Sequence, residues 1–415
     1  MQLNQVRENL NIFNTFGRNE KNGGVNRLAL THQERVAALK FSMLCQQAGL
    51  DVYFDFLGNV IARREGKYPD LQPVVIGSHI DTVKDGGQYD GLLGVVGALE
   101  VVNDLNRRQI ETDHPIVIIA FTCEESTRFN QATIGSKYLT GQYTREDLKD
   151  IKDNDGQVLY DIVYPLSQDM QNQTALFERN HIKAYLELHI EQGPILENKQ
   201  KDIGIVTHIA APHRFRLKLH GETSHSGSTP MPMRVDALTG ASEIIVNVER
   251  IANDFHEEGV VGTVGYADVY PNSMNAIPGE VTLLIDIRGK GYDSREAVVT
   301  QVKKMIQDVT ARRGLSFELE DLGQDIPVDL NPHMAHISET ACDTLGYSHR
   351  RMFSGAGHDA MNFAPICPTS MIFIPCEKGI SHSPKESVTD AQIEKGVQIL
   401  IYTAIEVARK DTHLE

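Results

Sequence analysis

Residues 73–122 read PVVIGSHIDTVKDGGQYDGLLGVVGALEVVNDLNRRQIETDHPIVIIAFT, and this stretch decides the fold class. The apolar runs 73–78 and 114–122 have the length of buried strands. Residues 91–105 between them have the pattern of a helix that packs closely through its glycines. Strand, helix and strand in this order predict a mixed, mainly parallel sheet with helices on both faces. We therefore expect an α/β fold.

The flanking segments extend this pattern toward both ends of the chain. Apolar residues at helical spacing predict a helix over 33–48, and DVYFDF and NVIARRE on either side of Leu57–Gly58 predict a hairpin. Near the C-terminus, residues 369–375 are typical of a buried strand and residues 390–409 of a helix. The parallel-sheet pattern therefore resumes late in the chain.

Residues 210–324 have a different order of expected strands and helices, which predicts an inserted domain. Strand, helix, strand, strand, helix and strand are expected over 213–221, 234–252, 260–270, 280–288, 294–314 and 315–322. This order is that of a ferredoxin-like α+β unit. The main domain is then discontinuous, over 1–209 and 325–415, which brings motifs from both ends of the chain together.

Composition limits the classes of partner. The chain has 415 residues, of which 41% are hydrophobic and 23% charged, as in a folded globular protein. The net charge of -16 at pH 7 disfavours nucleic acid and anionic membranes and favours a small-molecule partner. We find no signal-peptide pattern and no stretch long enough to span a membrane. Five cysteines without a C-x-x-C pair are typical of reduced thiols, so we expect a cytoplasmic protein.

Acids and imidazoles recur where the predicted strands end. His79 and Asp81 follow the first strand, at the edge where open α/β sheets place ligand sites, and Asp90 follows a glycine-rich turn. Glu124 and Glu125 follow the second strand, where carboxylates are costly unless a cation neutralises them. Taken singly, these acids are also typical of helix starts, and His79 of a packed core histidine.

Three further histidines lie in polar segments. His189 is in ELHIEQGP, where alternation places it on the same face as two glutamates, and His358 and His382 lie in loops. A single loop histidine is more often structural than a ligand. As a set, however, nitrogen and oxygen donors without thiolate suit Zn²⁺, Mn²⁺ or Co²⁺. A carboxylate that bridges two ions holds them roughly 3.5–4 Å apart, and such a pair activates water while a nearby carboxylate acts as general base.

Seven motifs carry these residues, in order along nearly the whole chain. They are GSHIDTVKDGGQYDG, CEESTRF, ELHIEQGPILE, HSGSTPMPMRVDAL, NAIPG with DIR, SGAGHDA and GISHSPKE. Together they resemble the hydantoinase/carbamoylase group of di-metal amidases, within the aminoacylase and carboxypeptidase-like metallohydrolases. The resemblance implies a zinc-exopeptidase-like main domain and a lid and dimerisation domain over 210–324.

The resemblance also implies the metal ligands. They are His79, Asp90, Glu125, His189 and His382. Asp90 is the expected bridge between two ions, Glu124 matches the general base, and Asp81 matches the carboxylate that orients His79. In peptidase relatives a carboxylate tends to replace His189, so this motif points to the carbamoylase branch.

Other motif residues match substrate contacts. The histidine that matches His225 contacts the substrate carbonyl oxygen in relatives, often from the partner subunit, and stabilises the oxyanion. Asn275 and Arg288 match further contacts, with Arg288 as a bidentate clamp for a carboxylate, although Arg288 by itself is a plain strand-end charge. The remaining matched pocket residues are Gln192, Gly357 and His358.

The expected activity is metal-dependent hydrolysis of a C–N bond other than a peptide bond. The expected substrate is an N-carbamoyl-L-amino acid, cleaved to amino acid, ammonia and carbon dioxide by a homodimer with two zinc, manganese or cobalt ions per subunit. Allantoate, ureidoglycolate and β-ureidopropionate carry a similar ureido group and carboxylate and remain alternatives. A metallopeptidase or N-acyl-amino-acid deacylase is more distant. A non-catalytic descendant is disfavoured because every expected ligand position is filled.

Overall fold

The computed structural model describes residues 1–167, 177 and 181–414, which form two compact units. The main unit comprises Met1–Thr207, Asp329–Met352 and Gly357–Glu415, and the inserted unit comprises His208–Val328 and Phe353–Ala356. The inserted unit is slightly wider than the expected 210–324. It also includes the short return of the chain at Phe353–Ala356, which no sequence pattern indicated.

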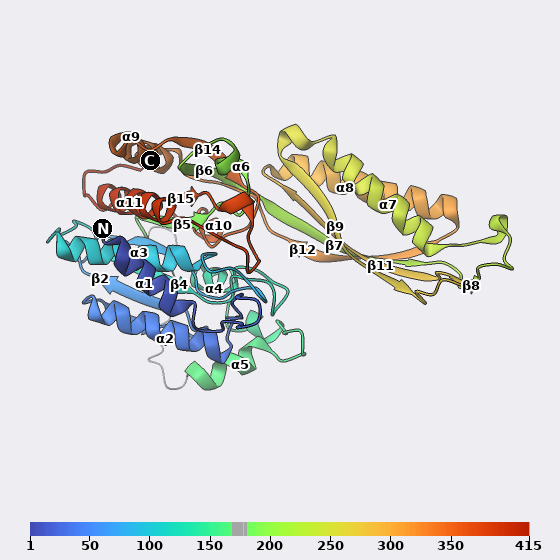
Figure 1. The fold of residues 1–415 in the computed structure, drawn as a ribbon, viewed down its shortest axis with the longest axis horizontal. Helices are drawn as coiled ribbons and strands as arrows, with labels where there is room; N and C mark the ends of the chain where they lie inside the picture. Colours follow the sequence, from blue (N-terminus) through green and yellow to red (C-terminus); the bar gives the residue numbers. More distant parts are fainter. Residues whose placement is uncertain (168–176, 178–180, 415) are drawn as a thin grey trace. The chain divides into compact units, whose positions relative to one another are not determined.

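The main unit is built on a mixed sheet of nine strands among the described residues (Figure 1). In spatial order they are β1 (Asp51–Phe54), β2 (Val60–Arg64), β4 (Ile116–Phe121), β3 (Val74–His79), β5 (Ala184–Ile190), β15 (Thr369–Ile374), β6 (Ile203–Ile209) and β13 (Val328–Asp329), with β14 (His349–Ser354) paired to β6. The central strands β4, β3, β5 and β15 are mutually parallel and buried along their whole length. This confirms the buried parallel centre that the apolar runs predicted, and β1 with β2 forms the expected hairpin.

Helices pack on both faces of this sheet. They are α1 (Leu3–Phe13), α2 (His32–Gln47), α3 (Leu92–Arg107), α4 (Ile134–Leu139), α5 (Leu159–Ser167), α6 (Ile195–Asn198), α9 (Pro332–Leu345), α10 (Ala360–Phe363) and α11 (Asp390–Val407), with short 3-10 turns at Asp147–Lys149 and Glu377–Gly379. On β5, Leu188 faces α3 and α11, and the adjacent Glu187 accepts a hydrogen bond from the first residue of α10, so these helices lie on opposite faces. Among the described residues, no helix combines the length and apolar character needed to cross a membrane.

The inserted unit is a four-stranded antiparallel sheet with two long helices. Its elements are β7 (Ala211–His220), α7 (Ala237–Asn253), β9 (Val260–Tyr270), β11 (Glu280–Gly289), α8 (Tyr292–Arg313) and β12 (Ser316–Gln324), and β8 (Ser224–His225) and β10 (Ala276–Ile277) form a small separate ribbon. Short 3-10 turns lie at Met231–Met233 and His256–Glu258. The strand order β12-β7-β11-β9 is that of the predicted ferredoxin-like unit. Alternating burial along β11 gives the unit a core of its own on the helix-covered face.

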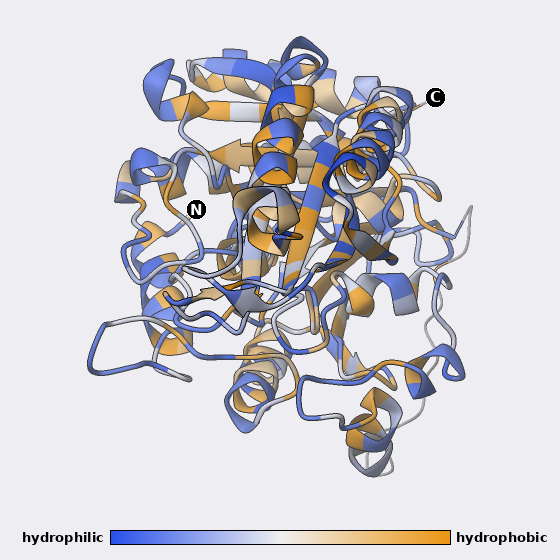
Figure 2. Cartoon of the chain, turned by 90° about the vertical axis from the view of Figure 1, so that its right-hand side faces the viewer, coloured by the Kyte–Doolittle hydropathy of each residue, from blue (hydrophilic) through white to orange (hydrophobic). Residues whose placement is uncertain are grey.

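The hydropathy of the residues varies with their place in the fold. Figure 2 shows hydrophobic residues along the strands, helices with both colours in alternation, and mainly hydrophilic residues on the outer loops. The alternation on the helices is the pattern of amphipathic segments with one buried stripe. Helix α3 differs, because its residues Leu92 to Val102 are all buried.

Two glycines let α3 lie close to the sheet. A Cβ atom at Gly94 would lie 2.4 Å from the main-chain oxygen of Leu188 and 2.6 Å from the Cβ of Ser78. A Cβ atom at Gly97 would lie 3.2 Å and 3.3 Å from methyl groups of Leu188 and Leu400, which can move. The predicted packing of this helix through its glycines is confirmed, and Gly94 is the tighter position.

The substitution Gly94→Ala should therefore destabilise the main unit more than Gly97→Ala. Both changes gain about 1 kcal/mol of helix propensity, but the backbone contact at Gly94 forces α3 away from β5 at an overpacking cost of about 1–3 kcal/mol. Thermal unfolding followed by circular dichroism measures the difference. Equal melting temperatures for the two variants would contradict the close packing at Gly94.

Candidate active site

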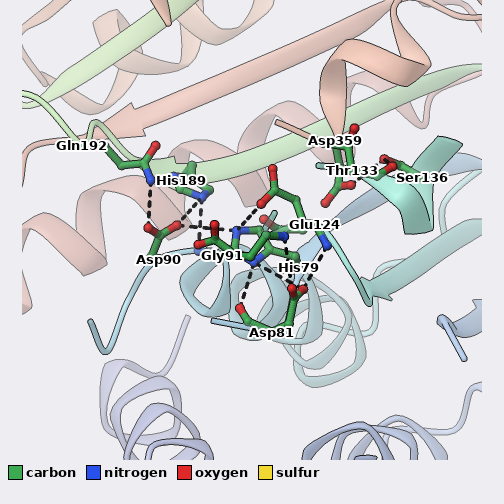
Figure 3. Close-up of polar contacts among 12 residues, drawn as sticks. His79, Asp81, Asp90, Gly91, Glu124, Thr133, Ser136, His189, Gln192 and Asp359 are labelled. Carbon is green, nitrogen blue, oxygen red and sulfur yellow. Dashed lines mark hydrogen bonds and ion pairs between the residues drawn. The ribbon is translucent and has the colours of Figure 1, made fainter. Parts of the chain in front are cut away.

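Asp90 is the centre of a buried polar cluster at the carboxyl ends of the central strands (Figure 3). Its Oδ1 lies 3.1 Å from Nε2 of His189 and 3.5 Å from Nε2 of His79, and its Oδ2 lies 3.2 Å from Nε2 of His382. Burial alone would raise the pKa of Asp90, but these imidazoles together hold it well below its usual range. One carboxylate thus faces three imidazoles that come from distant parts of the chain.

The two buried histidines of the cluster present a lone pair to the site. His79 Nδ1 lies 3.0 Å from the main-chain oxygen of Asp81, and His189 Nδ1 lies 2.9 Å from the main-chain oxygen of Ile190. A carbonyl oxygen only accepts, so each Nδ1 donates its proton and each Nε2 carries a lone pair when the ring is neutral. At His189 this lone pair accepts a hydrogen bond from the Gly91 amide at 3.1 Å. Gly91 is required here, because its φ is +64° and a Cβ atom would lie 2.4 Å from the His79 ring.

Glu125 and His382 form the other side of the cluster. Nε2 of His382 lies 3.2 Å from Oε1 of Glu125 as well as near Asp90. Hydrogen bonds to these two carboxylates raise the pKa of His382 to about 11. The His382 side chain is half exposed, whereas Glu125 and Asp90 are buried, so this side is the open side of the cluster.

Glu124 points toward the same space without joining the Asp90 hydrogen bonds. Its Oε2 lies 3.8 Å from Nε2 of His79. Burial raises the pKa of Glu124 well above its usual range, and the nearby acids Glu125 and Asp359 add to the shift. Several acids in one buried volume are unfavourable without cations, which argues for bound positive charge in this cluster.

Asp81 contacts both the acidic segment and His79. Its carboxylate accepts hydrogen bonds from the main-chain amides of Glu124 and Glu125, each at 3.1 Å. The hydrogen bond to His79 comes instead from the main-chain oxygen of Asp81, because the nearer carboxylate oxygen is 3.8 Å from Nδ1. Asp81 therefore joins the segment that carries the acids to the segment that carries His79.

The donor atoms are close enough for metal ions. Three groups of residues each place one ligand atom within 4.8 Å of the others: His79, Asp90 and His189; His79, Glu124 and Glu125; and Asp90, Glu125 and His382. Oδ1 of Asp90 is buried and has no hydrogen-bond partner, although three imidazole nitrogens surround the carboxylate. Carboxylate and imidazole donors of this kind suit a divalent cation such as Zn²⁺ or Mn²⁺.

Three expected pocket residues lie in the main unit. Nε2 of Gln192 donates to Oδ2 of Asp90 at 2.8 Å, so Gln192 contacts a residue of the candidate metal-ligand groups. The His358 ring contacts the His189 ring edge to face, with centroids 4.6 Å apart. Burial lowers the pKa of His358 well below its usual range, and His189 contributes to the shift, so His358 is neutral. Gly357 precedes it, and a Cβ atom at this position would lie 3.5 Å from Sδ of Met361.

The expected substrate residues of the inserted unit do not lie together. His225 on β8 pairs with Ala276 on β10, which places Asn275 beside it. Arg288 lies near the other end of β11, opposite Pro212 of β7, whereas Glu280 at the near end lies opposite His220. Eight residues of extended strand span about 27 Å, so one small molecule cannot touch Arg288 and the His225–Asn275 pair of the same chain.

The side chains of these residues are nevertheless suited to binding. The amides of Gly227 and Ser228 donate to Nδ1 of His225 at 3.1 and 3.2 Å, which leaves the proton of the neutral ring on Nε2. The Arg288 guanidinium donates twice to Asp286 at 3.1 Å, so Asp286 already engages its fork in this structure.

Sequence patterns missed the supporting residues of the cluster. Glu386 is buried and accepts hydrogen bonds from the amides of Tyr89 and Asp90, and Ser381 lies between Glu386 and Asp90. Asp359, behind Glu124, accepts a hydrogen bond from Ser136 (Figure 3). The only available signal was their presence in the motifs GISHSPKE and SGAGHDA, since neither has the spacing of a ligand.

Known proteins are similar to this chain in sequence and in structure. The family described as peptidase family M20/M25/M40 matches residues 75–406. An uncharacterized hydrolase of Haemophilus influenzae is 43% identical over 92% of this chain and 93% of its own length. The N-carbamoyl-L-amino-acid amidohydrolase of a Pseudomonas strain is 38% identical over 93% and 94%. Ureidoglycolate hydrolase of Arabidopsis thaliana and allantoate amidohydrolase of Bacillus subtilis are 35% and 34% identical, each over 91% of this chain and over 81% and 91% of their own lengths.

Structural similarity extends over both units. The crystal structure of an amidase of the hydantoinase/carbamoylase family from Burkholderia multivorans has a TM-score of 0.91 and 36% sequence identity, and the match covers 99% of each chain. The expected α/β fold, the expected resemblance and the expectation of a hydrolase are confirmed. The chain belongs to peptidase family M20/M25/M40, and its relatives in sequence and structure include the hydantoinase/carbamoylase amidases.

Proposed function

We propose that the main unit holds two divalent cations and hydrolyses the carbamoyl C–N bond of an N-carbamoyl-L-amino acid. The observation that carries this proposal is the position of Asp90, whose two carboxylate oxygens face different imidazoles, Oδ1 that of His189 and Oδ2 that of His382. His79 and His189 complete one ligand group, and Glu125 and His382 complete the other. A shared carboxylate between two ligand groups is the arrangement of a two-metal site.

Residues of the chain supply proton transfer and orientation. Bound divalent cations supply Lewis-acid polarisation of a carbonyl group and lower the pKa of water. Glu124 is buried beside this site and hydrogen-bonds to none of its ligands, so it is the group that takes a proton from the attacking water and delivers it to the leaving nitrogen. Breakdown of the carbamoyl group then yields the amino acid, ammonia and carbon dioxide.

The choice of substrate rests on relatives. Several relatives at 34–38% identity are named as N-carbamoyl-L-amino-acid amidohydrolases, which favours this substrate class. Allantoate and ureidoglycolate are alternatives, because relatives at 34–35% identity act on them by name. All three carry a ureido group for the metal cluster and a carboxylate that suits the fork of Arg288.

We also propose that the active enzyme is a homodimer joined through the inserted unit. Strand β9 is an edge strand, and its Val261 and Tyr270 are 57% and 67% exposed, while Val246 on the adjacent helix α7 is 62% exposed. Long edge strands with exposed apolar residues pair readily with a second chain. A dimer also accounts for the separation of Arg288 from His225, because the partner subunit can supply His225 and Asn275 to the site that Arg288 serves.

Ammonia release tests the substrate class directly. We expect the enzyme to act on N-carbamoyl-L-amino acids in preference to carbamoyl-β-alanine, allantoate, ureidoglycolate, dipeptides and N-acetyl-amino acids. Chelation should abolish this activity and Zn²⁺, Mn²⁺ or Co²⁺ should restore it, because the ligand cluster has no other source of positive charge strong enough to activate water. Full activity of protein shown to be free of metal would contradict the two-metal proposal, and a preference for allantoate would reassign the substrate.

Substitutions of the adjacent acids Glu124 and Glu125 should give different defects. Glu124→Gln should lower kcat by about 10²–10⁴-fold and keep both metal ions, because it removes the proton acceptor and no ligand. Glu125→Gln should lose metal, because it replaces a carboxylate ligand with an amide. Elemental analysis of the purified variants and steady-state kinetics measure both effects. An unchanged kcat for Glu124→Gln would remove it as the base.

Mixed dimers test whether the site is shared between subunits. A dimer with Arg288→Ala in one chain and His225→Ala in the other, purified through two different tags, should keep about half of the wild-type activity, because one site stays intact. A dimer of a wild-type chain with the doubly substituted chain should be almost inactive, because each site then lacks one residue. The reverse pattern would show that each chain serves its own site.

A further inference from the structure

Glu386 connects the two loops that carry metal-cluster residues. Its Oε1 accepts hydrogen bonds from the main-chain amides of Tyr89 and Asp90, at 2.7 and 3.1 Å. Its Oε2 lies 2.8 Å from the hydroxyl oxygen of Ser381, and that hydroxyl lies 2.8 Å from Oδ2 of Asp90. Glu386 therefore contacts the main chain of Asp90 and, through Ser381, its carboxylate.

Neither loop is held by regular secondary structure. Asp90 lies between the end of β3 at His79 and the start of α3 at Leu92, and His382 lies between a 3-10 turn that ends at Gly379 and the start of α11 at Asp390. His382 also has a left-handed backbone, with φ of +54°. Backbone hydrogen bonds tie Gly86 to Val25 and Glu377 to Ser387, but among the described residues none is recorded between one loop and the other. Hydrogen bonds that involve side chains make the direct link between the loops.

The loop around Asp90 is shaped to receive the Glu386 carboxylate. A Cβ atom at Gly87 would lie 2.1–2.3 Å from the carboxyl atoms of Glu386, so the loop can wrap around this group only because residue 87 is glycine. The Glu386 side chain is almost completely buried, at 4% exposure. Burying a carboxyl group is costly unless hydrogen bonds replace its contacts with water. The hydrogen bonds of Glu386 meet this requirement and at the same time join the two loops.

We propose that Glu386, acting through Ser381 and the amides of Tyr89 and Asp90, is a positioning residue that sets the distance between the Asp90 carboxylate and the His382 imidazole. The separation of these ligands, 3.2 Å here, decides whether one ion can bind both. The hydrogen bonds recorded for the Glu386 carboxylate go to the amides of Tyr89 and Asp90 and to Ser381. Glu386 therefore acts on the proposed metal centre by setting the positions of its ligands. This inference rests on the proposed two-metal centre.

Manganese titration of the apoprotein tests this role independently of substrate. Unbound Mn²⁺ is followed by electron paramagnetic resonance, which gives the number of sites and their affinities. Glu386→Ala and Ser381→Ala should weaken one of the two sites by about 10–100-fold, the usual effect of removing a partner that orients metal ligands. Glu386→Gln should bind almost as the wild type, because its amide oxygen can accept from both main-chain amides and its NH₂ group can donate to Ser381.

Glu377→Gln is the matched control. Glu377 lies nine residues before Glu386 in the same segment, its side chain is 57% exposed, and its recorded ion pair is with Lys378, so the same chemical change there should leave both sites unchanged. With substrate, Glu386→Ala should lower kcat with little change in KM, and Glu386→Gln should restore it. A merely structural role would instead lower thermal stability and leave the affinities of the folded protein equal.

The outcomes separate the two proposals. Wild-type affinities at both sites in Glu386→Ala and Ser381→Ala would overturn the positioning role and leave the metal centre intact. If Glu386→Gln lowers the Mn²⁺ affinity as much as Glu386→Ala does, hydrogen bonds of residue 386 are not what positions the ligands, and the proposal is overturned. If Glu386→Ala does not fold, Ser381→Ala and Glu386→Gln decide by the same criteria. Two bound ions without hydrolysis of any ureido compound would contradict only the proposed activity, whereas a wild-type protein that binds fewer than two ions would overturn both.

Discussion

The electrostatic cost of burying carboxylates determines how the polar cluster of the main unit is arranged. Asp81, Asp90, Glu124 and Glu125 all lie inside the protein, where water cannot solvate their charges. Three of them have specific hydrogen-bond or ion-pair partners: imidazoles around Asp90, main-chain amides at Asp81, and His382 at Glu125. The carboxylate of Glu124 lies 3.8 Å from Nε2 of His79. The remaining excess of negative charge makes the cluster a binding place for cations, and the histidines with lone pairs turned inward match that requirement.

Parallel strands make this concentration of charge possible. Because β4, β3, β5 and β15 run in the same direction, the residues after each of them arrive at one edge of the sheet. The strands fix where the loops start, but they do not fix the loops themselves. Hydrogen bonds that the carboxylates of Asp81 and Glu386 accept from main-chain amides, together with glycines at 87 and 91 that allow close approach, complete the geometry.

The inserted unit contributes a different constraint. Its strand β11 carries Arg288 near one end, and His225 lies on the separate β8–β10 ribbon, which precedes the other end of β11 in the chain. A rigid sheet cannot bring its two ends onto one small molecule, and the proposal of a second chain rests on this constraint. The exposed edge strand β9 is a surface on which such a chain can add.

Sequence patterns were sufficient for the elements with strong periodicity. Apolar runs predicted β3, β4 and β15, and alternation predicted the strands of the inserted unit, because side-chain burial repeats with the backbone geometry. The family resemblance implied His79, Asp90, Glu125, His189 and His382 as one ligand set, and the structure places them in overlapping groups.

Only the tertiary structure decided how the groups are joined. The roles of Asp81 and Glu386 depend on contacts between segments up to 297 residues apart, and no local pattern records which oxygen faces which amide. The separation of Arg288 from His225 follows from strand register, which is set by pairing between strands. The short return at Phe353–Ala356 joins the inserted unit through space, not through its own sequence. Sequence by itself determined which donors the protein has and which strands carry them, whereas through-space packing determined their distances and partners.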